Sequence, residues 1–162
     1  MKLKIIRYAA YSLEIILMLV LQSTPGLIPE VFGGKPILLV SCALSIAAVD
    51  EVIPTLAFAA VCGAFADISA GGTVGFFAVA LTLLCYVLCC LMRYFFSTGT
   101  VVALPFCLSA VVVILGARFL IFALPPGGAE LFVNHYISRI VYTFAATVPL
   151  YFLNRFLSGV LR

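Results

Sequence analysis

Long apolar runs separated by short polar or turn-forming stretches dominate this 162-residue chain. Four of these runs cover residues 8–21, 73–92, 100–124 and 137–157. Their lengths are close to the roughly 20 apolar residues that a helix needs to cross a bilayer. Each run is therefore predicted to form one transmembrane helix.

The run 36–66 is too long for a single span. As one helix it would measure about 46 Å at about 1.5 Å per residue, against a hydrocarbon core of about 30 Å. It would also hold Asp50 and Glu51 at mid-membrane, where charge is costly. Splitting the run at these acids moves both to a water interface and puts Pro54 in the first turn of the next helix, where proline is tolerated.

We therefore expect a bundle of six transmembrane helices, the second and third of them short. A re-entrant pair that does not fully cross is the alternative for 36–66, and both versions leave the two ends of the chain on the same side. Composition agrees, because 65% hydrophobic residues, 9% charged residues and a mean hydropathy of +1.31 are too apolar for a soluble domain. The fold class is an all-α integral membrane protein with one transmembrane domain over 1–162.

The basic residues orient the predicted bundle. In this topology six of them fall on one side and two on the other, and cytoplasmic loops carry the excess of Lys and Arg. Both termini are therefore predicted to be cytoplasmic. The first group is Lys2, Lys4, Arg7, Arg93, Arg155 and Arg162, and the second is Lys35 and Arg139. These residues are scattered singly, so nucleic acid is not predicted as a partner.

No catalytic set is visible in the sequence. The single histidine, His135, has no nearby acid and is interpreted as an interfacial residue. The six cysteines lie in apolar runs, where cysteine usually acts as a small hydrophobe. Cys85 and Cys89 could share a helix face, but no histidine or carboxylate stands beside them to complete a metal site. We expect neither an enzyme nor a bound metal or cofactor.

Three charged residues inside or beside the apolar runs need a reason. Glu14 lies in the first helix, and Arg93 and Arg155 are its expected partners, in a structural pair or a proton relay. Asp67 ends the third helix, and Arg118 lies at a similar depth in the fifth, so the two are predicted to pair. The alternatives are that Asp67 caps the fourth helix and that Arg118 snorkels to the outer headgroups.

Small residues recur at helical spacing around Asp67, which lets helix backbones approach closely in lipid. The glycines concerned are Gly63, Gly71 and Gly75, with Ala59 four residues before the first of them. Internal packing and a docking face for another membrane protein both explain this pattern.

Three stretches resemble the rod shape-determining protein MreD family. The most specific is GAFADI at 63–68 followed by GGTVGF at 71–76, and LQST at 21–24 and GGKPILL at 33–39 add to it. The match in length and number of spans covers the whole chain. Ile37 and Arg118 depart from the family pattern, which puts partner contacts at those positions in doubt.

The resemblance implies a non-enzymatic membrane scaffold subunit of the bacterial cell-elongation complex, located in the plasma membrane. Its partners would be MreC and, through it, MreB, a RodA-type glycosyltransferase and a class B penicillin-binding protein. The function implied is cell-shape maintenance through lateral peptidoglycan synthesis. The alternative is the substrate-binding subunit of an energy-coupling-factor vitamin transporter, whose small six-helix fold has a similar architecture.

Overall fold

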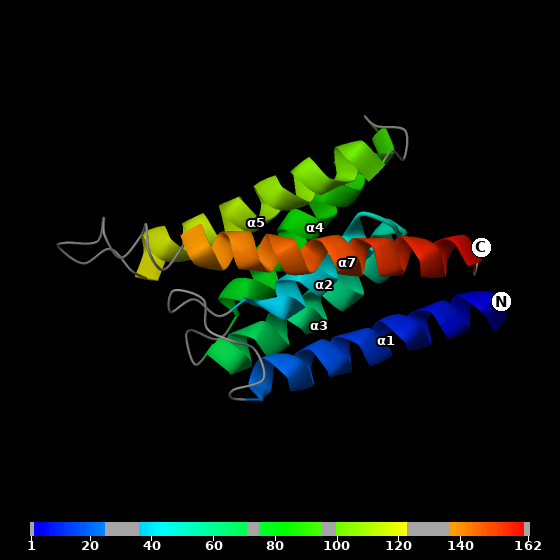
Figure 1. Ribbon diagram of the computed structural model, residues 1–162, viewed down its shortest axis with the longest axis horizontal. Helices are drawn as coiled ribbons and strands as arrows, with labels where there is room; N and C mark the ends of the chain where they lie inside the picture. The colour runs from blue at the N-terminus through cyan, green and yellow to red at the C-terminus, as the bar shows by residue number, and fades with distance from the viewer. Residues whose placement is uncertain (1, 25–35, 71–74, 95–99, 123–136, 161–162) are drawn as a thin grey trace.

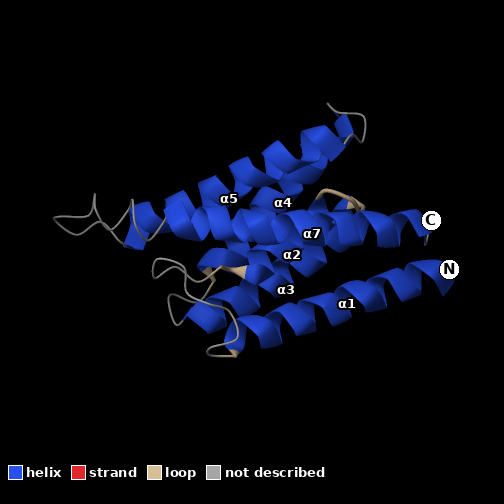
Figure 2. Ribbon diagram, in the orientation of Figure 1, coloured by secondary structure: helices blue, strands red, loops and turns tan. Residues whose placement is uncertain are grey.

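The computed structural model describes residues 2–24, 36–70, 75–94, 100–122 and 137–160, and every regular element in these ranges is helical (Figures 1 and 2). The helices are α1 (Lys2–Ser23), α2 (Leu38–Ala47), α3 (Val52–Ala70), α4 (Phe76–Tyr94), α5 (Thr100–Phe122) and α7 (Ser138–Val160). The expected all-helical architecture with six helices is thus confirmed for the part of the chain described, whereas the expectation that all six cross a membrane stays a prediction. Four helices, α1, α3, α4 and α7, are long and apolar enough to cross a membrane.

The predicted break at Asp50 and Glu51 is confirmed, because α2 ends at Ala47 and α3 begins at Val52 with Pro54 in its first turn. The prediction that both helices are short is wrong for α3, which has 19 residues. The length of α3 predicted from the apolar run 36–66 was too small, because the helix continues through Asp67 to Ala70. Only α2 is short, since its 10 residues measure about 15 Å.

α2 lies at the centre of the bundle and packs against all five other helices. All ten of its residues are buried. Because neighbouring helices surround it, α2 does not need a length that matches the hydrocarbon core. The Cys85 and Cys89 thiols of α4 both face this helix, 3.8 Å from the Ala43 carbonyl oxygen and 3.1 Å from that of Ala47.

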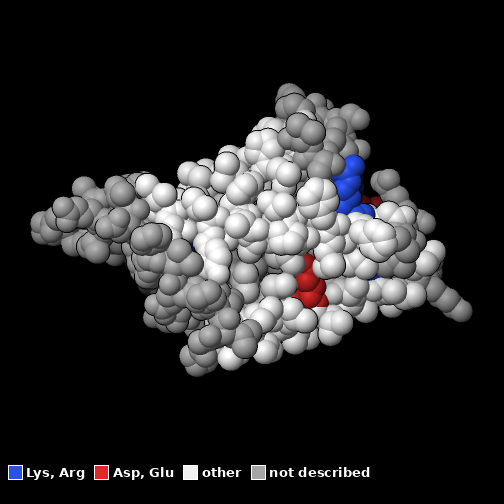
Figure 3. All heavy atoms as spheres, in the orientation of Figure 1, with Lys and Arg blue, Asp and Glu red and all other residues white. Residues whose placement is uncertain are grey.

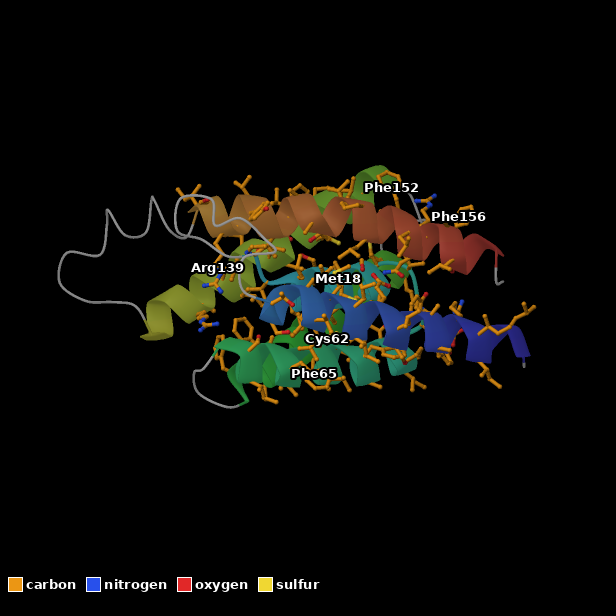
Figure 4. The ribbon with its side chains drawn as sticks, turned by 60° about the horizontal axis from the view of Figure 1, so that its bottom comes forward. Met18, Cys62, Phe65, Arg139, Phe152 and Phe156 are labelled. Atoms are coloured by element: carbon orange, nitrogen blue, oxygen red, sulfur yellow. The ribbon has the colours of Figure 1, made fainter. Side chains whose placement is uncertain are left out.

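Side-chain contacts at the two ends of α1 fix the directions of the first three helices. Arg7 Nη2 lies 2.9 Å from Asp50 Oδ1, which places the α2–α3 turn beside the start of α1. At the other end, Gln22 Nε2 donates to Ser69 Oγ at 2.8 Å, and Gln22 Oε1 accepts from the Leu39 N–H at 3.3 Å. The helices alternate in direction, and the start of α1 and the end of α7 lie at one end of the bundle (Figure 1). Arg139 lies at the opposite end (Figure 4).

Candidate functional site

Asp67 caps the N-terminus of α4. Its buried carboxylate accepts the backbone N–H groups of Gly75 at 3.0 Å, Phe77 at 2.9 Å and Ala78 at 3.1 Å. These donors lack partners within their own helix, and the helix dipole favours a negative charge beside them. Capping of the fourth helix, one of the two roles considered for Asp67, is the one found.

The predicted ion pair between Asp67 and Arg118 is not among the contacts of the described residues, so that prediction is wrong. Arg118 instead places its guanidinium over the ring of Phe77, 4.7 Å from the ring centroid. Phe77 therefore touches both residues, with its backbone N–H on Asp67 and its ring on Arg118. The carboxylate of Asp67 is hydrogen-bonded by backbone N–H groups, and the guanidinium of Arg118 makes a cation–π contact with the ring of Phe77.

Gly63 lets α3 and α4 approach closely at the same corner. A Cβ atom placed on Gly63 would lie 2.5 Å from the Ala78 Cα and 2.6 Å from the Phe77 carbonyl oxygen. Gly75 has φ +104°, a conformation that favours glycine, and its N–H is one of the Asp67 donors. Both glycines therefore serve internal packing and turn geometry. Gly71 lies outside the described residues.

Glu14 lies near the middle of α1, because the helix begins at Lys2, before the apolar run at 8–21. The residue is 7% exposed, and its Oε1 accepts from Asn154 Nδ2 on α7 at 3.2 Å. The prediction that Arg93 or Arg155 pairs with Glu14 is wrong. Neither arginine forms a salt bridge with Glu14, and Arg155 Nη1 donates to the Tyr151 hydroxyl at 2.9 Å.

The Glu14 carboxyl belongs to a small polar cluster in an apolar bundle. Asn154, fully buried, also donates to Ser45 Oγ on α2 at 2.8 Å. Ser45 in turn donates to the Cys42 carbonyl at 2.7 Å. Glu14 Oε2 and Asn154 Oδ1 are buried acceptors without a hydrogen-bond partner among the described residues. Each of these two oxygens can still accept a hydrogen bond. A donor that reached them would be favourable, because unpaired acceptors are costly in a low-dielectric interior.

A groove of about 870 Å³ runs between α1 and α7 beside this cluster. On this face, acidic atoms lie between the two helices among uncharged side chains (Figure 3). Met18, one of the lining residues, lies on α1, whereas Phe152 and Phe156 point away from the bundle on α7 (Figure 4). The groove is lined by Ala10, Leu13, Glu14, Leu17, Met18, Leu21, Pro36, Leu38, Tyr142, Ala145, Ala146, Pro149, Leu150, Leu153 and Leu157.

Sequence reasoning identified Glu14 but missed Asn154 and Ser45. Asn154 carried a usable signal, because it is an amide within the otherwise apolar last helix. Ser45 carried little, because serine in a buried helix often bonds only to its own backbone. The pairing was hidden by a sequence separation of 140 positions, since the packing of α1 and α7 on α2 is what brings Glu14 and Asn154 together.

Searches of protein-family models, curated proteins and solved structures find no match to this chain. The site must therefore be interpreted from its own geometry. An apolar groove lined by one acidic side chain can bind an apolar ligand or protein segment that carries a hydrogen-bond donor or a cationic group.

Proposed function

We propose that this chain is a non-enzymatic scaffold subunit of the bacterial rod complex, of the MreD kind, in the plasma membrane. Its direct partner is MreC, and through MreC it is linked to MreB, a RodA-type glycosyltransferase and a class B penicillin-binding protein. Its role is to support cell-shape maintenance and lateral peptidoglycan synthesis.

The groove between α1 and α7 is the observation that carries this proposal. Its lining residues on α1 run from Ala10 to Leu21, about three helical turns, so it is elongated along the helix. Apart from Glu14 and Tyr142 the lining is apolar. Such a surface suits an assembly contact with another membrane protein, which is what a scaffold needs.

Residues that carry the family resemblance also have structural roles that suit a scaffold. Gln22 joins the end of α1 to the start of α2 and the end of α3. Gly63, Asp67 and Gly75 make the close joint between α3 and α4. We further propose that both termini are cytoplasmic, as the asymmetry of basic residues favours.

The alternative is a substrate-binding subunit of an energy-coupling-factor vitamin transporter, a family with a similar six-helix fold. Such a protein needs several polar groups that converge on its ligand. The lining of this groove supplies two polar side chains, Glu14 and Tyr142, which favours the scaffold.

Affinity purification from gently solubilised membranes of the native host separates the two functions. With the full-length tagged protein as bait, we expect MreC in an amount comparable to the bait, measured by mass spectrometry. An unrelated tagged multi-pass protein from the same host is the control. Recovery of a transporter ATPase together with a bound vitamin, and no MreC above the control, would reject the scaffold.

A further inference from the structure

We infer that the groove between α1 and α7 receives one transmembrane helix of a partner protein, and that this helix presents a lysine or arginine side chain to Glu14. The inference rests on the proposed scaffold function for the class of partner, a membrane protein. It adds where that protein docks and which chemistry recognises it.

The charge of Glu14 selects the cation. Glu14 is 7% exposed, and the hydrogen bond that its carboxyl accepts from Asn154 comes from a neutral amide. No Lys or Arg of the described residues forms a salt bridge with it, whereas Asp50 and Glu51 each have one. An acid inside a membrane is costly unless a cation or several donors receive it. Glu14 lines the groove, so a partner that binds in the groove can supply the cation for its carboxyl.

Small residues and a proline on α7 line the part of the groove where a partner helix would pack. Ala145 and Ala146 of α7 line the groove, and small residues let helices approach closely within lipid. Pro149 also lines it and has no N–H, so the Ala145 carbonyl lacks its usual helical donor.

Two other occupants fit these features less well. A lipid acyl chain fills apolar space but offers neither a cation nor a donor to Glu14. A second copy docked groove against groove would bring two Glu14 carboxyls together, and like charges repel at low dielectric. A helix with one basic side chain satisfies both the apolar walls and the acid.

Photocrosslinking in native membranes tests the docking site. We place benzoylphenylalanine at Leu17, which lines the groove and is 51% exposed, and at Val87 on α4, which is 50% exposed outside it. A second matched pair is Leu153 in the groove and Tyr86 on α4, both 49% exposed. At both groove positions we expect at least ten times more adduct with one membrane protein than at the α4 positions.

The adduct also tests the chemistry. The crosslinked peptide should come from a transmembrane segment with a Lys or Arg within about one helical turn of the crosslink. Glu14→Gln should lower the adduct at Leu17 at least five-fold, while Glu51→Gln, at an exposed acid outside the groove, should leave it unchanged. Monodisperse elution of both variants in size-exclusion chromatography shows that they fold.

Several results would overturn the inference: adducts with lipid only, adducts with a second copy, equal yields inside and outside the groove, or no response to Glu14→Gln. These failures are separable from failure of the scaffold function. If MreC co-purifies but the groove positions give no preferential adduct, docking in the groove is wrong and the scaffold stands. If the groove traps a helix from a protein unrelated to the rod complex, the groove inference stands and the rod assignment is wrong.

Discussion

Replacing Arg7 with alanine is expected to lower the free energy of unfolding by about 3–5 kcal/mol, because it leaves the Asp50 carboxylate buried without its cation. The two side chains are 7% and 1% exposed, and Arg7 Nη2 lies 2.9 Å from Asp50 Oδ1. This pair holds the start of α1 against the α2–α3 turn. Unfolding of the purified protein by SDS in mixed micelles measures the change.

Two controls separate the buried pair from general effects of charge. The double replacement Arg7→Met with Asp50→Leu removes both charges and is expected to stay within about 1 kcal/mol of the natural protein. Lys4→Ala removes one side of the exposed Lys4–Glu51 pair at 3.9 Å, where contributions are about 0–1 kcal/mol. If Arg7→Ala and Lys4→Ala destabilise equally, the buried pair does not have the role described here.

Gly63→Ala is expected to destabilise the protein by about 1–3 kcal/mol, although alanine is the better helix former. The added methyl would lie 2.5–2.7 Å from backbone atoms of Phe77 and Ala78. Those atoms cannot retreat freely, because the N–H groups of the same two residues bond to Asp67. The two helices must therefore separate at this corner, and the same SDS titration measures the loss.

Gly116→Ala is the matched control for Gly63→Ala. Gly116 lies inside α5, and among the described residues outside its own helix turn a Cβ atom there would meet no heavy atom within 4 Å. Its replacement should leave stability unchanged or raise it by up to about 1 kcal/mol. A tolerated Gly63→Ala would contradict the close approach of α3 to α4.

Most of the fold could be predicted from the lengths of the apolar runs and from the positions of two acidic residues. Asp50 and Glu51 marked the break between α2 and α3 because charge inside lipid is costly. Helix ends were predicted less well. α1 starts at Lys2, since lysine and arginine are good helix formers and do not stop a helix at the membrane surface. α3 runs past the apolar region because Asp67, buried against α4, does not have to reach water.

The partners of the charged residues could not be predicted in the same way. Sequence reasoning estimated depth, and depth alone paired Asp67 with Arg118 and Glu14 with arginines. Which side chains meet also depends on the direction in which each one points, and that direction is set by how whole helices pack. Asp67 bonds to the N–H groups at the α4 N-terminus and forms no salt bridge with a Lys or Arg of the described residues. Asn154 reaches Glu14 because α2 holds α1 and α7 at its sides.

Depletion of the protein in a rod-shaped native host tests the scaffold function most directly. The account predicts that cells lose their rod shape and become round or swollen, and that expression of the intact chain restores the rods. Cells that keep their shape after depletion, but lose uptake of a vitamin, would contradict the account and favour the transporter.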